Sequence, residues 1–127
     1  MKTYKIAAIP GDGIGTEVVD AGVEVLKALA KREGTFEVAV DHFDWGGEYY
    51  KKHGRMMPEN GRDQIRHHDA ILFGSAGHTD IPDHITLWGL RLAICQPFDQ
   101  YANVRPTRIL PGITSPLRAV SGPELDW

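Results

Sequence analysis

Cysteine is almost absent from this chain: Cys95 is the single one among 127 residues. A lone thiol cannot close an internal disulfide, which favours a reducing compartment. Long apolar runs are absent too, since no stretch approaches the roughly 20 apolar residues of a membrane span. The apolar run at residues 6–9 is too short for a signal peptide. We therefore expect a cytoplasmic protein with no membrane partner.

An excess of charge of one sign is also missing. The formal net charge is −3, so the chain offers no basic surface to nucleic acid. What is present is ordinary for a globular domain, with 42% hydrophobic and 24% charged residues. A chain of 127 residues fits one domain with a core of normal size.

The first forty residues predict a β-α-β unit. Residues 4–9 are a short apolar run rich in β-formers. Over residues 36–41, Phe36, Val38 and Val40 alternate with Glu37, Ala39 and Asp41, so both segments are expected to be strands. Between them, residues 14–31 carry a broad apolar stripe at helical spacing, and Gly34 suits the C-terminal stop. Strands joined through a helix are parallel, with a right-handed crossover. The predicted fold class is α/β.

The rest of the chain predicts further elements of the same kind. A buried apolar run at residues 69–74 indicates a third strand. His67 and His68 are expected at the surface. The remaining expectations are a short helix at residues 44–53, a helix from Pro58 to about residue 67, a helix at 85–96, a strand at 101–110 and irregular chain at 111–127.

Residues 11–15, Gly-Asp-Gly-Ile-Gly, join the first strand to the first helix. Backbone N–H groups at a helix start can bind an anion. The pattern is not the dinucleotide fingerprint, because Thr16 stands where the last glycine belongs, and it lacks the Gly-Lys-Ser/Thr ending of a P-loop. A tight turn that needs glycines for its φ angles and binds nothing is the alternative reading.

Residues 74–84 form the second candidate site. They follow the third predicted strand, and ligands of open α/β sheets bind beyond the carboxyl ends of the strands. Gly74 and Gly77 would let a cofactor approach the backbone closely. His78 and His84 do not have a metal-ligand spacing. The alternative is a solvated loop.

Arg91 and Arg105 are the most informative pair of side chains. Two guanidinium groups brought together can each bind one carboxylate with two parallel hydrogen bonds, which indicates a small dicarboxylic acid as ligand. Arg91 lies among apolar residues of the predicted helix at 85–96, where an arginine must snorkel, pair or face a polar pocket. The alternative is that Arg91 snorkels and Arg105 pairs with Asp99. Cys95 is expected to be a small packed side chain.

Three motifs in order resemble a known family: Pro-Gly-Asp-Gly-Ile-Gly at residues 10–15, Gly-Ser-Ala-Gly at 74–77 and Asn-Val-Arg-Pro at 103–106. Residues 1–127 resemble the N-terminal part of the metal-dependent β-decarboxylating dehydrogenases, which include isopropylmalate, isocitrate, D-malate and tartrate dehydrogenases. Residues 83–89 and 98–101 resemble the tartrate/D-malate branch most. The resemblance implies an isopropylmalate-dehydrogenase-like fold, present here as parallel β-α-β units of an incomplete sheet.

The resemblance also implies a function. Family members oxidise a 2-hydroxy acid with NAD, and a divalent metal, Mn²⁺ or Mg²⁺, assists the loss of carbon dioxide. Arg105 matches the arginine that binds the retained carboxylate. Arg91 lies one turn before the usual helix arginine, whose place Cys95 takes, so it either replaces that arginine or binds a second polar end of the substrate. The implied cofactor-binding residues are Ile14, Gly74, Ser75, Ala76, Gly77, His84 and Thr86, with His84 standing where many relatives carry a glutamate.

The remaining family features would follow Trp127. These are the catalytic tyrosine and lysine, the metal-binding aspartates and the adenine-binding loop, so no catalytic or metal-binding residue is assigned in residues 1–127. Relatives share their active site across a homodimer. The resemblance therefore implies a chain that is inactive alone, with uncovered apolar surface. Two alternatives stay open: an isopropylmalate- or isocitrate-type dehydrogenase, and a small anion-binding α/β module without chemistry.

Overall fold

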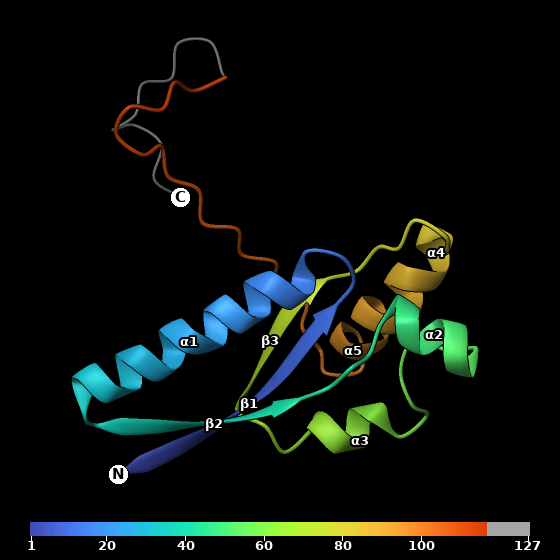
Figure 1. Cartoon of the computed structure of the whole chain (residues 1–127), viewed down its shortest axis with the longest axis horizontal. Helices are drawn as coiled ribbons and strands as arrows, with labels where there is room; N and C mark the ends of the chain where they lie inside the picture. The colour runs from blue at the N-terminus through green and yellow to red at the C-terminus, as the bar shows by residue number, and fades with distance from the viewer. Residues whose placement is uncertain (117–127) are drawn as a thin grey trace.

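The centre of the fold is a sheet of parallel strands (Figure 1). In the computed structural model, which describes residues 1–116, the strands are β1 (Lys2–Gly11), β2 (Phe36–His42) and β3 (Ala70–Ser75). β1 lies in the middle, in the order β2-β1-β3, and Ile9 of β1 pairs with Phe73 of β3. The predicted strands, their parallel pairing and the α/β class are confirmed.

One long helix covers one face of the sheet. α1 (Gly15–Glu33) buries Val19 and Val23 against side chains of all three strands. It ends at Gly34, whose φ of 64° is the left-handed conformation that favours glycine and whose N–H donates to the carbonyl of Ala30. The predicted helix and its stop are confirmed.

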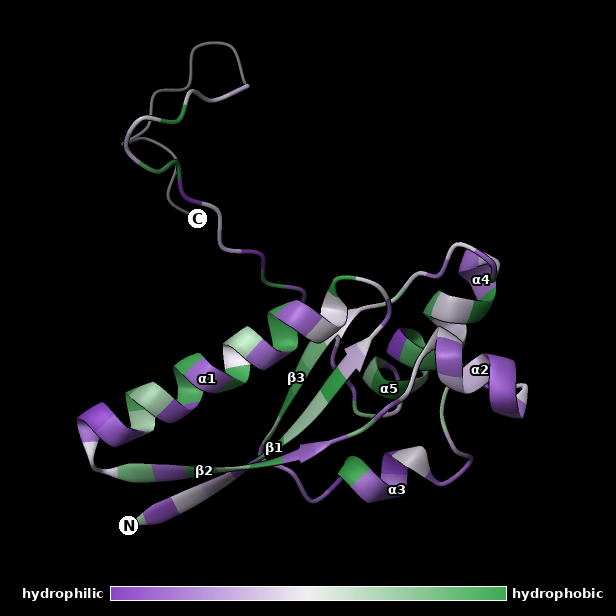
Figure 2. Cartoon of the chain, in the orientation of Figure 1, coloured by the Kyte–Doolittle hydropathy of each residue, from purple (hydrophilic) through white to green (hydrophobic). Residues whose placement is uncertain are grey.

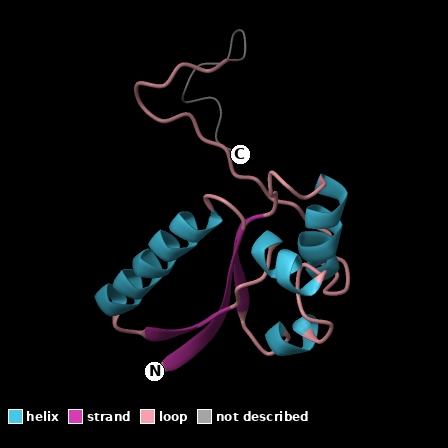
Figure 3. Ribbon diagram, turned by 45° about the vertical axis from the view of Figure 1, so that its right-hand side comes forward, coloured by secondary structure: helices cyan, strands magenta, loops and turns pink. Residues whose placement is uncertain are grey.

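Shorter helices cover the opposite face (Figure 3). They are α2 (Gly47–His53), α3 (Gly61–Ile65) and a continuous stretch of α4 (Asp83–Thr86), η1 (Leu87–Leu92) and α5 (Ala93–Cys95). The last stretch confirms the predicted helix at 85–96, although its middle part is a π-helix. Leu90 and Ile94 from this stretch meet Ile9 of β1 in the larger core cluster.

The predicted helix from Pro58 begins later than expected. The N–H of Gly61 donates to the carbonyl of Pro58 at 2.9 Å, so Pro58 opens a turn and the helix starts at Gly61.

The prediction that His68 lies at the surface is wrong. Its side chain is 7% exposed, with Nε2 2.9 Å from the carboxylate of Asp41 and Nδ1 3.1 Å from the carbonyl of Ile65. The contact with Asp41 comes from a distant segment, and the local sequence does not indicate it.

Residues 101–110 do not form the predicted strand. The chain leaves α5 and runs as coil away from the sheet (Figure 1), with Tyr101, Val104 and Arg105 exposed. An extended segment becomes a strand only when a neighbour supplies backbone hydrogen bonds, and within residues 1–116 no strand of the sheet pairs with it. Residues 111–116 are irregular as predicted, and 117–127 lie outside the described residues.

α1 carries exposed apolar side chains on its outer surface. Ile14, Val18, Val25 and Leu29 are 66%, 49%, 67% and 37% exposed. Figure 2 shows hydrophobic bands along this helix. The residues recur at helical spacing, so they extend the apolar stripe beyond the part that the sheet covers.

Candidate functional site

The carboxyl ends of β1 and β3 lie side by side, and the chain leaves them in opposite directions. From Gly11 it turns to α1 on one face, and from Ser75 it continues to α4 on the other (Figure 3). Adjacent parallel strands with divergent connections create the crevice where open α/β sheets bind ligands. We call this edge, residues 11–15 and 74–84, the carboxyl-edge site.

Three glycines keep the two loops of this site in backbone contact. A Cβ atom on Gly74 would lie 2.9 Å from the Cα of Gly15, and one on Gly15 would lie 2.8 Å from the nitrogen of Ser75. A Cβ on Gly11 would lie 3.0 Å from the carbonyl carbon of Ser75. The packing of one loop on the other therefore requires glycine at these three positions, whatever the site binds.

Gly13 and Gly77 have a different reason to be glycine. Their φ angles are 54° and 153°, and a Cβ on either would meet no atom within 4 Å. Glycine adopts these conformations without steric cost. The space beside both residues is open, so these two positions are where a ligand can approach the backbone.

The predicted cofactor-binding residues differ in accessibility. Thr86 is buried, and its hydroxyl donates to the carbonyl of Asp83 at 3.2 Å, so the start of its own helix already uses this group. The exposed residues of the set are Ile14, Gly77 and His84, and the half-buried ones are Gly74, Ser75 and Ala76. Gly74 and Ser75 end β3, Ala76 and Gly77 begin the loop that follows it, and His84 and Thr86 lie in α4.

Arg91 and Arg105 lie on different kinds of structure. Arg91 is half-buried on η1, and Arg105 is exposed in the coil after α5. Within residues 1–116, neither guanidinium makes a hydrogen bond or an ion pair, and the alternative pair of Arg105 with Asp99 is not formed. The structure does not join the two arginines through a shared contact.

A polar network joins α2 to the loop after β3. Lys51 Nζ lies 3.1 Å from the carboxylate of Glu48 and 3.2 Å from that of Asp80. His78 completes the network, because its Nε2 lies 3.2 Å from Glu48 and its Nδ1 accepts the N–H of Asp80 at 3.1 Å. The hydrogen bonds from Lys51 and then His78 lower the pKa of Glu48, and those to Glu48 and then Asp80 raise the pKa of Lys51.

The network predicts a pH dependence with a definite sign. Since the folded pKa of Glu48 lies below its ordinary value of 4.5, its contribution to stability is present above that value and is lost as the pH falls through the folded pKa. The contribution of Lys51 is present below 10.5 and is lost as the pH rises through its raised pKa. An NMR titration of the Glu48 carboxyl should show a midpoint below 4.5. The midpoint should rise in Lys51→Met and stay unchanged in the neighbouring control Lys52→Met; an unchanged midpoint in both would contradict the network.

Asp12 and the pair Gly46-Gly47 were not predicted from the sequence as part of the site. Asp12 is 4% exposed, and Gly46 and Gly47 follow β2, outside both predicted loops. Nothing in the spacing of Asp12 between two glycines distinguishes a solvated acid from a buried one. The signal that was available is the pair of adjacent glycines just beyond the end of a strand, which marks a close approach of backbone.

Residues 1–116 contain no group of three His, Cys, Asp or Glu side chains placed to hold a metal ion. Within the same residues, no helix combines the length and apolar character that crossing a membrane requires.

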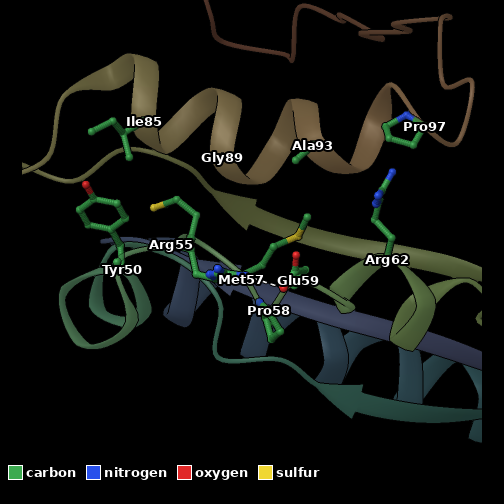
Figure 4. A pocket seen from close by; sticks show the side chains of 12 residues that line it. Tyr50, Arg55, Met57, Pro58, Glu59, Arg62, Ile85, Gly89, Ala93 and Pro97 are labelled. Atoms are coloured by element: carbon green, nitrogen blue, oxygen red, sulfur yellow. Dashed lines mark hydrogen bonds and ion pairs between the residues drawn. The ribbon is translucent and has the colours of Figure 1, made fainter.

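A groove of about 500 Å³ lies between the segment from Tyr50 to Arg62 and the stretch α4–η1–α5 (Figure 4). Gly89 lets the side chain of Met56 pack closely against η1, since a Cβ on this glycine would lie 2.8 Å from Met56 Cγ. Most of the lining is apolar, with Arg55, Glu59 and Arg62 at the side of the 54–62 segment. No residue of the carboxyl-edge site lines this groove, so it is a separate feature.

Comparison with known proteins identifies the family. Residues 5–126 match the family model described as isocitrate/isopropylmalate dehydrogenase. The chain belongs to the isocitrate/isopropylmalate dehydrogenase family. The solved apo structure of a β-decarboxylating dehydrogenase from Thermococcus kodakarensis is 34% identical and has a TM-score of 0.60, over 77% of this chain and 27% of that one. The implied fold and the resemblance to this family are thereby confirmed.

Curated relatives are similar along the whole chain. A probable tartrate dehydrogenase/decarboxylase from Agrobacterium vitis is 64% identical over 127 residues, which are 100% of this chain and 36% of that protein. A decarboxylating D-malate dehydrogenase from Escherichia coli is 47% identical over 129 aligned residues, covering 100% of this chain and 36% of that protein. The chain thus spans about a third of the length of the curated relatives that it matches.

Proposed function

We propose that this chain is the N-terminal part of an NAD-dependent and divalent-metal-dependent enzyme that oxidises and decarboxylates a 2-hydroxy dicarboxylic acid such as tartrate or D-malate. The observation that carries the proposal is the 64% identity, along the entire chain, to a probable tartrate dehydrogenase/decarboxylase. The 47% identity to a decarboxylating D-malate dehydrogenase supports the same class of substrate. We propose further that the full-length parent works in the cytoplasm as a homodimer.

The carboxyl-edge site fits one part of NAD. Ile14 is exposed at the start of α1, and the open space beside Gly13 and Gly77 lets a flat ring or a ribose approach the backbone. NAD, when bound, accepts the hydride from the hydroxyl-bearing carbon of the substrate. In our proposal residues 74–77 and His84 flank the cofactor. Thr86 is buried and its hydroxyl proton is donated to the carbonyl of Asp83, so it contributes by supporting the start of α4.

Arg91 and Arg105 are proposed to bind the substrate. Each guanidinium lacks a partner within the described residues and can donate two parallel hydrogen bonds to a carboxylate. A dicarboxylic acid provides one such group at each end. A divalent metal would stabilise the charge that develops as carbon dioxide leaves. Residues 1–116 hold no group of three His, Cys, Asp or Glu side chains placed for a metal ion, so we assign no step to a metal here.

The proposal is tested by restoring the sequence that follows residue 127 and measuring NADH formation. We expect the full-length parent to reduce NAD with tartrate or D-malate in the presence of Mn²⁺, and the 127-residue chain alone to give none. Isopropylmalate and isocitrate serve as comparison substrates. A parent that prefers either of these, or that gives no NADH with any 2-hydroxy acid, would contradict the proposed substrate class.

A further inference from the structure

Asp12 is a buried acid that bonds to backbone and to no cation. It is 4% exposed, and no lysine, arginine or histidine of residues 1–116 forms an ion pair with it. A buried carboxylate without compensation is strongly unfavourable. The compensation here comes from two backbone amides. Asp12 Oδ1 accepts the N–H of Gly47 at 2.5 Å, and Oδ2 accepts the N–H of Gly77 at 3.1 Å.

These two bonds connect loops that belong to different strands. Gly47 begins α2, after the end of β2, and Gly77 lies on the loop after β3. The main chain of Asp12 is bonded as well, since its N–H donates to the carbonyl of Ser75 at 2.8 Å and its carbonyl accepts the N–H of Gly15 at 2.9 Å. One residue therefore ties together the loops that follow all three strands of the sheet.

The glycines around Asp12 are fitted to its carboxylate. A Cβ on Gly46, whose φ is 145°, or on Gly47 would lie 2.9 Å from Asp12 Oδ1. The ring of His78 also packs against Gly47, so closely that the same Cβ would lie 2.8 Å from His78 Cγ. The loops after β2 and β3 therefore both contact the carboxylate, at different oxygens.

We propose that Asp12 is a positioning residue: its carboxylate is an internal anion that occupies the amides of Gly47 and Gly77 and fixes the three carboxyl-end loops as one surface. Amides at such positions often bind the phosphates of a ligand. Here the N–H groups of Gly47 and Gly77 donate to Asp12 and are not offered to a ligand. A ligand would instead be bound through the shape of the surface beside Gly13 and Gly77. The effect of this surface on NAD rests on the proposed function, whereas the tie itself does not.

Amide hydrogen exchange of the 127-residue chain tests the tie. In Asp12→Asn one carboxylate oxygen becomes an NH₂ group, which cannot accept a hydrogen bond. At least one of the amides of Gly47 and Gly77 should then exchange at least tenfold faster, and both should do so in Asp12→Ala. The amides of Gly34 and Gly54, which bond to helix carbonyls, should keep their wild-type rates.

Asp44→Asn is the matched control, because Asp44 is an exposed acid in the loop after β2. It should leave all four amides unchanged. Two results would overturn the proposal. One is wild-type exchange at both Gly47 and Gly77 in Asp12→Ala. The other is equal acceleration at all four amides, which would mean that Asp12 contributes to global stability alone.

If the Asp12 variants do not fold, the hydrogen bonds of Asp12 can still be tested in the wild-type chain. Scalar couplings across the hydrogen bonds should link the nitrogens of Gly47 and Gly77 to the side-chain carbonyl carbon of Asp12, and their absence would refute the tie. In the full-length parent, Asp12→Asn should raise the KM for NAD about tenfold and leave the KM for the hydroxy acid within a factor of two. A wild-type parent that does not reduce NAD would refute the proposed function and leave the exchange result standing.

Discussion

Replacing Gly15 by alanine is expected to destabilise the chain by at least about 3 kcal/mol, because no side chain fits between the two loops. The added methyl group would lie 2.8 Å from the nitrogen of Ser75 and 3.1 Å from the carbonyl carbon of Pro10, both of them backbone atoms. Backbone cannot rotate away as a flexible side chain can. Urea unfolding followed by circular dichroism measures the loss of free energy of unfolding.

Gly22→Ala is the matched control, since it makes the same change on the same helix. There the new methyl group would lie 3.4 Å from the side-chain Cδ2 of Leu72, which can give slightly. Alanine is also the better helix former, by about 0.5–1 kcal/mol. Gly22→Ala should therefore be neutral or stabilising. Equal stabilities for the two variants would contradict the account of how the loops pack.

Replacing Arg105 by alanine in the full-length parent is expected to lower kcat/KM for the hydroxy acid by about 30- to 4,000-fold. The loss of a charged partner from a desolvated carboxylate costs about 2–5 kcal/mol, and each 1.4 kcal/mol is about a factor of ten. Arg105 makes no side-chain bond among residues 1–116 that would give it a structural role. Initial rates of NADH formation measure the effect.

Arg66→Ala is the control for removal of a guanidinium. Arg66 is exposed and pairs with Asp63 at 3.5 Å, a surface ion pair of small energetic value. Its variant should keep kcat/KM close to wild type. Arg91→Ala should also lower kcat/KM. Comparing the loss of kcat/KM between tartrate and D-malate shows which end of the acid Arg91 binds. If the full-length parent with Arg105→Ala has the same kcat/KM as the Arg66→Ala variant, Arg105 does not bind the substrate.

The strands and helices were predictable from sequence because their signals are local. The apolar run of β1, the alternation in β2 and the stripe of α1 each record burial at a fixed period. Gly34 and Gly54 marked helix ends for the same reason, since both adopt the left-handed conformation there. The strand expected at 101–110 failed because extended chain also needs a neighbour, and a local pattern does not show whether one is present.

The location of the site in the chain was predictable from the sequence, but the roles of most of its residues were not. The two glycine-rich loops were located correctly at the carboxyl ends of β1 and β3. The sequence left open whether their glycines bind a ligand or permit packing, and the structure assigns packing to Gly11, Gly15 and Gly74. Asp12 was missed because its partners, Gly47 and Gly77, are 35 and 65 residues away in sequence. Only the folded chain brings them together.

We propose that the carboxyl-edge site binds NAD and that Arg91 and Arg105 bind a dicarboxylic hydroxy acid. The most direct measurement is a crystal structure of the full-length parent with NAD and tartrate. We predict that the cofactor lies against Ile14 and residues 76–77 and that Arg105 bonds to a carboxylate of the acid. A complex in which NAD lies elsewhere and Arg91 and Arg105 both point away from the bound acid would contradict the claim.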